Sequence, residues 1–170
     1  MASMRSDTGA VSVEQEFIVT RLLDASPAVV FRAWTDPGQF KRWWGPKDFT
    51  TPHCTIDLRP GGQFHYCMRS ANGQEYWGKG LYREIVEPSL LVFTDLFSDA
   101  TGSTVSAATY GFGADWPEEP VVRVTFEDEA GKTRLTIRGG VSVEAAERYG
   151  AKDGWTSSIE KLDALVSAGN

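Results

Sequence analysis

The sequence predicts an α+β domain in which an antiparallel sheet curls around one long C-terminal helix. One strand-like segment comes first, two short helical segments follow it, and all the other strand-like segments run in succession before the final helix. That helix, 155–166, carries its apolar residues along a single stripe, which indicates that one face is buried. A run of strands closed by one amphipathic helix is typical of a sheet covered by a helix on one face.

We expect a single domain over residues 14–168, preceded by a tail over 1–13 whose small and polar residues predict disorder. The first strand covers 14–23, where β-branched and aliphatic residues are frequent. A chain of this length buries roughly 68–70% of its unfolded surface on folding. It can therefore build a core without disulfides or a structural metal.

Two short helices follow the first strand. Ser26-Pro27 supplies a capping side chain and a first-position proline to a helix over 28–34. Asp36-Pro37 repeats this start signal for a second helix over 38–44, which Gly45-Pro46 ends. Both helix starts thus have a physical cause in the local sequence.

The next two strands, 51–58 and 63–69, form a hairpin whose register follows from their apolar faces. The two faces meet only if paired residue numbers add to an even sum. Cys67 then points away from Cys54, so we expect two free thiols and no disulfide. The apolar faces consist of Cys54, Ile56 and Leu58 on one strand and Phe64, Tyr66 and Met68 on the other.

Further strands are expected at 75–86, 90–97, 121–127 and 133–138. After them, Ser142 caps a short helical stretch that ends at Tyr149, ahead of the final helix.

The segment 98–120 is too long for an ordinary connection in a compact domain. It carries three large rings, Tyr110, Phe112 and Trp116, which a monomer would otherwise expose. These rings either close a cavity as a lid or contact a second subunit, and a homodimer contact is slightly favoured.

Charge and composition exclude several classes of protein. A formal net charge of −6 lacks the basic surface that nucleic acid requires, so we expect no nucleic-acid partner. No apolar run reaches the ~18 residues of a membrane span, and residues 1–16 hold no signal-peptide core. Two cysteines do not make a secreted disulfide scaffold. The expectation is a soluble cytoplasmic domain with no membrane partner.

The sequence offers no metal or cofactor motif. The two histidines, His53 and His65, lack ligand partners at helical or zinc-finger spacing, and strand alternation turns both away from the apolar faces. Neither a phosphate-binding glycine loop nor a nucleophile elbow is present. We expect no metal, no cofactor and no catalytic residue.

Aromatic residues make up 12% of the chain, with six Trp, five Tyr and nine Phe. One interpretation is a ligand cavity lined by flat rings and a few polar tips. The other is that these rings simply fill the core. The inward candidates are Phe31, Trp34, Phe64, Tyr66, Met68, Trp77, Tyr82, Phe93, Trp155 and Ile159.

Four carboxylates are candidates for acid–base chemistry: Asp57, Glu75, Glu84 and Asp95. An apolar cavity would raise the pKa of such a group into a catalytically useful range. A structural role as solvated or turn-stabilising charges is favoured, because Asp57 and Glu84 each lie near an arginine.

Several motifs, in this order and spacing, resemble the activator-of-Hsp90-ATPase-like family of the START-like (SRPBCC) superfamily. The resemblance covers about 14–166, and no single motif decides it. The motifs are Asp36-Pro37, Trp43-Trp44-Gly45-Pro46, Asp57-Leu58-Arg59-Pro60-Gly61-Gly62, Gly80-Leu81-Tyr82-Arg83-Glu84-Ile85, Leu91-Val92-Phe93-Thr94, Thr125-Phe126-Glu127 and Gly154-Trp155-Thr156-Ser157-Ser158.

The resemblance implies a helix-grip fold, in which a seven-stranded antiparallel sheet wraps the C-terminal helix and two short helices close one end. It also implies a cavity between sheet and helix that takes a small hydrophobic molecule, the leading expectation for function. A polyketide-cyclase-like enzyme using Tyr66 or a buried carboxylate is one alternative, and a chaperone-interacting module is another. A carboxylate or tyrosine inside the cavity would favour the enzyme. We expect no counterpart of the additional N-terminal domain of the chaperone activator, because the resemblance covers only its C-terminal domain.

Overall fold

The computed structural model describes residues 16–168; the expected tail and the first two residues of the first expected strand lie outside this range. Seven antiparallel strands form one sheet in the order β1-β7-β6-β5-β4-β3-β2. The elements are β1 (Glu16–Leu23), α1 (Pro27–Thr35), α2 (Pro37–Trp43), β2 (Thr50–Ile56), β3 (Gln63–Arg69), β4 (Glu75–Val86), β5 (Leu90–Phe97), η2 (Ala107–Tyr110), β6 (Val121–Glu129), β7 (Lys132–Ser142), α3 (Val143–Arg148) and α4 (Ala151–Ala168).

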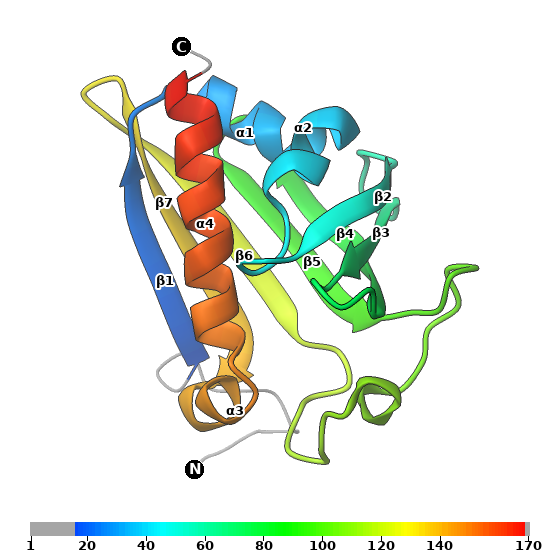
Figure 1. The fold of residues 1–170 in the computed structure, drawn as a ribbon. Coiled ribbons are helices and arrows are strands. Elements are labelled where there is room, and N and C mark those ends of the chain that lie inside the picture. Colours follow the sequence, from blue (N-terminus) through cyan, green and yellow to red (C-terminus); the bar gives the residue numbers. More distant parts are fainter. Residues whose placement is uncertain (1–15, 169–170) are drawn as a thin grey trace.

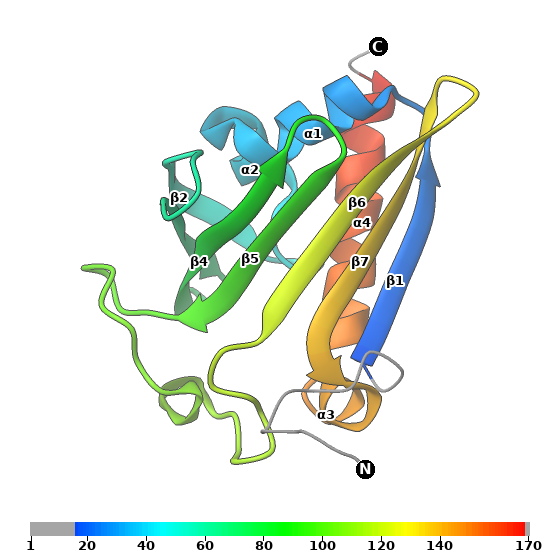
Figure 2. The ribbon, with the colours of Figure 1, turned by 180° about the vertical axis from the view of Figure 1, so that it is seen from behind.

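The long helix α4 lies across the concave face of the curved sheet, and none of the described helices covers the other face (Figures 1 and 2). Helices α1 and α2 cover one end of the sheet, and α3 with the segment 98–120 lies at the other end (Figure 1). This arrangement confirms the predicted α+β, helix-grip class. No helix within residues 16–168 is long and apolar enough to cross a bilayer.

The capping signals predicted for the two short helices are confirmed. The Ser26 hydroxyl accepts a hydrogen bond from the Val29 amide at 3.4 Å, and the Asp36 carboxylate accepts one from the Gln39 amide at 3.0 Å. Each oxygen satisfies an amide that has no partner inside its helix. The two helices are also tied together, because the Trp43 indole donates to the Ala33 carbonyl at 2.9 Å.

The predicted hairpin register is confirmed as well. Cys54 pairs with Tyr66 and Ile56 pairs with Phe64, both with an even sum. Cys67 lies opposite His53 on the other face, and both cysteines are free. Strand β2 ends earlier than expected, at Ile56, so Leu58 lies in the following turn and is 39% exposed.

Two glycines of β4 let aromatic rings of β3 lie flat on the sheet. Gly78 pairs with Tyr66 and Gly80 with Phe64, and a Cβ atom at either glycine would collide with the ring of its partner. Gly80 is therefore covered by the Phe64 ring and borders no open space. A larger side chain there would displace a core ring and would not fill a cavity.

The final helix begins earlier than its apolar stripe indicates, at Ala151 and not at Trp155. Gly150, with φ of +71°, separates it from α3, which the Ser142 hydroxyl caps by accepting from the Ala145 amide at 3.1 Å. This left-handed conformation is one that glycine adopts without strain. The polar first turn of α4 has no stripe of its own, which is why periodicity missed it.

Candidate ligand site

A pocket of about 210 Å³ opens near α3 and the segment 98–120, at the end of the sheet that α1 does not cover. We call it the aromatic pocket. Its walls come from the residues after α2, from β3 and β5, from the segment 98–120, from the α3–α4 junction and from the first two turns of α4. They comprise Trp44, Gly45, Pro46, Tyr66, Met68, Asp95, Leu96, Phe97, Phe112, Trp116, Tyr149, Gly150, Ala151, Gly154, Trp155 and Ser158.

Small residues at the start of α4 leave this space open. Gly150, just before the helix, and Ala151 and Gly154 in its first turns line the pocket, and none of them has more than one side-chain carbon. Farther along the same helix, Ile159 and Leu162 are 1% and 0% exposed in the core. The sheet–helix layer is therefore filled along most of α4 and hollow at its start.

Three of the ten residues predicted to line a cavity reach this pocket: Tyr66, Met68 and Trp155. Six others are packed in the core and lie outside it. Their space is taken up by other rings: Phe31 lies 5.3 Å from Phe126, and Phe64 lies 5.0 Å from Phe93, between ring centroids. These six are Phe31, Trp34, Phe64, Tyr82, Phe93 and Ile159.

The inward position predicted for Trp77 is wrong. Its indole lies on the other face of the sheet, stacked on His65 with centroids 5.1 Å apart and 5.5 Å from His53. Alternation explains this, because Trp77 follows Tyr76 and precedes Gly78, and Gly78 faces the inner ring of Tyr66. The predicted outer positions of both histidines are confirmed by the same stack.

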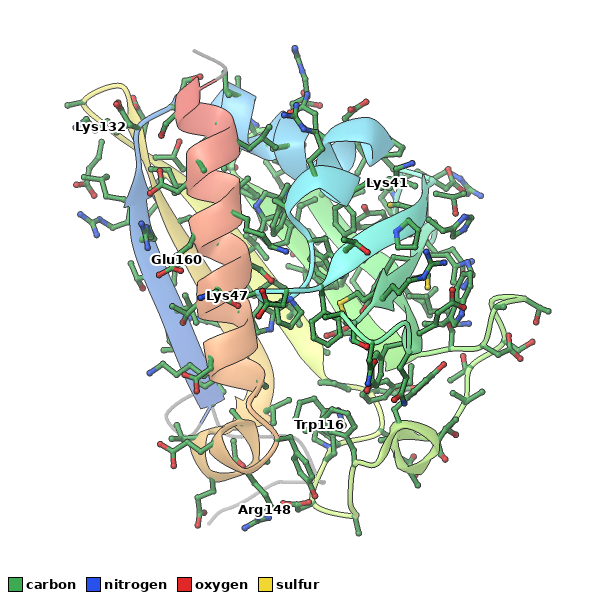
Figure 3. All side chains as sticks on the ribbon, viewed as in Figure 1. Lys41, Lys47, Trp116, Lys132, Arg148 and Glu160 are labelled. Carbon is green, nitrogen blue, oxygen red and sulfur yellow. The ribbon has the colours of Figure 1, made fainter. Side chains whose placement is uncertain are left out.

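Of the three rings on the segment 98–120, Phe112 and Trp116 form part of the pocket wall. Both pack on Tyr149, with centroid distances of 4.9 and 5.8 Å. Figure 3 shows Trp116 between this segment and the start of α4, above Arg148 of α3. Tyr110 serves a different purpose: its hydroxyl donates to the Ser98 carbonyl at 2.7 Å and accepts from the Trp77 amide at 3.3 Å.

Polar contacts hold the same segment against the α3–α4 junction. The Tyr149 hydroxyl donates to Asp115 at 2.7 Å and accepts from the Gly113 amide at 2.9 Å, and Arg148 forms an ion pair with Asp115. The hydrogen bond from Tyr149, with the nearby Arg148 charge, lowers the pKa of Asp115. We call Asp115, Arg148 and Tyr149 the latch. The predicted contact with a second subunit stays a prediction.

Among the described residues, Asp95 is the one carboxylate of the pocket wall. Burial raises its pKa from 3.8 to about 7, and within residues 16–168 its side chain makes neither a hydrogen bond nor an ion pair. Tyr66 faces the same space; burial, followed by the nearby Asp95 charge, raises its pKa well above 10. The pocket therefore combines an apolar wall with an acid that is close to half-ionised at neutral pH.

The other three candidate carboxylates lie at the surface, as the structural interpretation expected. Asp57 pairs with Arg59 at 2.9 Å, Glu75 pairs with Arg69 at 2.7 Å, and Glu84 is exposed. Surface ion pairs of this kind contribute little to stability. Asp95 alone departs from the expectation for this group.

Clusters of metal ligands and reactive thiols would be further candidate sites. No group of three His, Cys, Asp or Glu side chains in the described part of the chain could hold a metal ion. Burial raises the pKa of the Cys54 thiol to about 12, so it is protonated and a poor nucleophile at neutral pH.

Some pocket residues could have been found in the sequence and others could not. Asp95 lies two residues after Phe93 on β5, and side chains two residues apart on a strand point to the same face, so an inward Phe93 already implies an inward Asp95. Pro46 and Tyr149 reach the pocket only because separate segments pack at the start of α4, and no local pattern signals that.

The sequence profile of the family described as "Activator of Hsp90 ATPase homolog 1-like protein" matches residues 24–167. Solved structures with the same fold include a protein from Arthrobacter aurescens, 27% identical, covering 93% of this chain and 90% of that chain with a TM-score of 0.78. A Mycobacterium smegmatis protein is 27% identical, covering 88% of each chain, with a TM-score of 0.72. An AHSA1 protein from Silicibacter pomeroyi, 22% identical, covers 91% of this chain and 99% of that chain with a TM-score of 0.70. No protein with a curated description matches the chain.

Proposed function

The chain belongs to the Activator of Hsp90 ATPase homolog 1-like family, and we propose that it binds a small hydrophobic or aromatic molecule in the aromatic pocket. The observation that carries the proposal is a space of about 210 Å³ walled by seven aromatic side chains and only a few polar groups. Ligand sites are commonly apolar concavities with a small number of placed polar groups. A space of this size suits one ring with a short substituent.

The binding free energy would come mainly from apolar surface that leaves water, about 25 cal/mol for each Å². The walls support this because they are already packed against one another. The Trp44 and Trp155 rings lie 5.1 Å apart and Phe112 and Tyr149 lie 4.9 Å apart. A preformed wall needs little ordering when the ligand arrives, which favours affinity.

The segment 98–120 acts in this proposal as the lid of the pocket. Its Phe112 and Trp116 rings form wall, and the latch ties it to the α3–α4 junction. A ligand enters when this segment moves away from Tyr149. The predicted lid role is therefore preferred to a subunit contact for these two rings.

A matched pair of substitutions on α4 tests the proposal. Ala151→Leu adds three carbons at the pocket wall, whereas Ala164→Leu adds them on the exposed face of the same helix. Alanine and leucine are both strong helix formers, so the helix itself is little affected. With 2-phenylethanol as probe, we expect titration calorimetry to show at least about tenfold weaker binding for Ala151→Leu and unchanged binding for Ala164→Leu. Equal affinity for both variants would contradict the proposal.

A second function, acid–base catalysis, is favoured by one observation: the carboxyl of Asp95, with a pKa of about 7, lies in the pocket wall. A group with such a pKa is well suited to take and return a proton near neutral pH. In that role the ionised carboxylate would remove a proton from the carbon beside a ligand carbonyl and then return one to it.

Phenylacetone in deuterated buffer tests this second function. Its CH₂ protons exchange for deuterium when a base removes one proton and solvent-derived deuterium replaces it, which NMR follows directly. We expect faster exchange with the native protein than with Asp95→Asn. Equal rates for the two proteins would reject catalysis by Asp95 and leave the binding proposal standing.

A further inference from the structure

The carboxyl of Asp95 lies in the pocket wall with no basic side chain to balance its charge. Asp57, Glu75, Asp115, Glu129 and Asp163 each pair with an arginine. Asp95 makes no such contact within residues 16–168, and no Lys, Arg or His of that part of the chain lines the pocket. Any charge that develops inside the pocket is therefore negative.

The aromatic walls around this carboxyl also favour a ligand with a positive charge. The faces of aromatic rings carry partial negative charge and attract cations within about 6 Å, tryptophan most strongly. Three tryptophans, Trp44, Trp116 and Trp155, line the space beside Asp95. A carboxylate and a set of ring faces together attract an ammonium group and repel a carboxylate or phosphate.

The volume limits the rest of the ligand. An engineered apolar cavity of about 150 Å³ holds one benzene molecule, and a water molecule occupies about 30 Å³ in the liquid. The aromatic pocket, at about 210 Å³, has room for one benzene-sized ring and a chain of a few atoms. A bulkier polycyclic ligand exceeds this space.

We propose that the ligand of the aromatic pocket is a small aromatic amine whose ring packs against Trp155 and Trp116 and whose ammonium group faces Asp95. This inference rests on the proposed binding function and specifies the class of ligand. Folding has already removed part of the hydration of the carboxyl, so most of the further loss of hydration falls on the ammonium group when the two meet. A preformed acceptor of this kind makes a charge-assisted hydrogen bond stronger than a neutral one.

Binding should then depend on pH through the ionisation of Asp95. The other titratable groups that face it are the hydroxyls of Tyr66 on β3 and Tyr149 at the α3–α4 junction. The pKa of Tyr66 is raised well above 10, so it stays neutral. An alkylammonium group keeps its proton up to about pH 10. Because the pKa of Asp95 is about 7, amine affinity should rise about tenfold from pH 6 to pH 8.

Three probes of similar size separate the charge from the ring: 2-phenylethylamine, 2-phenylethanol and phenylacetate. Titration calorimetry at pH 8 should give the amine at least about tenfold higher affinity than the alcohol, with phenylacetate the weakest. Asp95→Asn should abolish the preference, so that the amine and the alcohol bind this variant with affinities within about twofold of each other. Glu84→Gln, the same chemical change at an exposed position, should leave all three affinities unchanged.

The outcomes distinguish this inference from the proposed function. If the alcohol binds and the amine binds no more tightly, or if Asp95→Asn keeps the preference for the amine, the inference is wrong and the binding function stands. If none of the three probes binds the native protein, the binding function fails and the inference fails with it.

Discussion

The two ends of the sheet use the same residue types for opposite purposes. At the end covered by α1 and α2, which we call the closed end, Phe31, Trp34, Phe40 and Trp43 are at most 2% exposed. Their rings fill the space between helices and sheet; Trp34 and Trp43, for example, have centroids 4.8 Å apart. At the other end, the aromatic pocket is walled by rings of similar size and still encloses about 210 Å³.

The difference lies in what each ring faces. At the closed end every ring meets another ring or an aliphatic side chain of the core. At the pocket the rings also pack on one another, but they share the wall with Gly150, Ala151 and Gly154, which carry little or no side chain. Aromatic composition alone therefore does not indicate a binding site. A site forms where small residues stand opposite the rings.

The largest expected effect separates structural rings from pocket rings. Trp43→Ala should lower the free energy of unfolding by about 3–5 kcal/mol, since it empties a fully buried site. Trp116→Ala, at a half-buried pocket position, should cost only about 1–2 kcal/mol. Urea unfolding of both variants checks this, and losses of equal size would mean that the two ends are not different.

The next effect concerns the charge at the pocket. Unfolded, Asp95 loses its proton near pH 3.9; folded, it keeps that proton up to about pH 7. The native state thus binds more protons in between, so this group makes the protein less stable as pH rises from about 4 to 7. Asp95→Asn removes the effect, and should gain stability relative to the native protein by up to about 4 kcal/mol at pH 8 but not at pH 3.5. A gain that does not depend on pH would show that the carboxyl is not desolvated.

Two glycines give a smaller contrast of opposite sign. Gly80→Ala pushes a Cβ atom into the Phe64 ring and should cost about 1–3 kcal/mol. Gly154→Ala meets only Pro46, at 3.4 Å, inside a helix, and should add about 0.5–1 kcal/mol. Thermal unfolding measures both. Loss of stability in Gly154→Ala would show that the start of α4 has no spare room.

The smallest expected effect is kinetic and concerns the latch. Tyr149→Phe keeps the ring but removes the hydroxyl that joins Asp115 and the Gly113 amide. We expect faster association and dissociation of 2-phenylethanol in NMR line-shape analysis, with nearly the same affinity. Tyr76→Phe removes a hydroxyl outside the pocket and should leave both rates unchanged. If the two variants behave alike, the segment 98–120 does not gate the pocket.

Much of this fold could be predicted because its signals are local. The strands 75–86 and 90–97 have the expected bounds, and the caps at Ser26 and Asp36 act as expected. The hairpin register followed from the side on which Cys54 and Tyr66 lie. Each of these features depends on a few neighbouring residues and on the alternation of a strand.

The site could be predicted only in part, because it depends on packing between distant segments. Tyr66, Met68 and Trp155 were predicted correctly. The prediction placed both Trp77 and Tyr82 inward, although residues an odd number of positions apart on one strand point to opposite faces of the sheet. The bulge of β4 comes after Tyr82 and does not change this parity. No pattern in the sequence shows that α4 starts four residues before its apolar stripe, and that early start supplies the small residues of the pocket.

One measurement tests the central claim, that the rings at the two ends have different functions, most directly. Each of the six tryptophans carries one indole N–H group, which a ¹H–¹⁵N NMR spectrum can follow while 2-phenylethanol is titrated into the sample. We predict the largest shifts at Trp44, Trp116 and Trp155, which line the pocket, and none at Trp43 in the closed end or Trp77 on the outer face. Shifts that are equal across all six signals, or largest at Trp43, would contradict the claim.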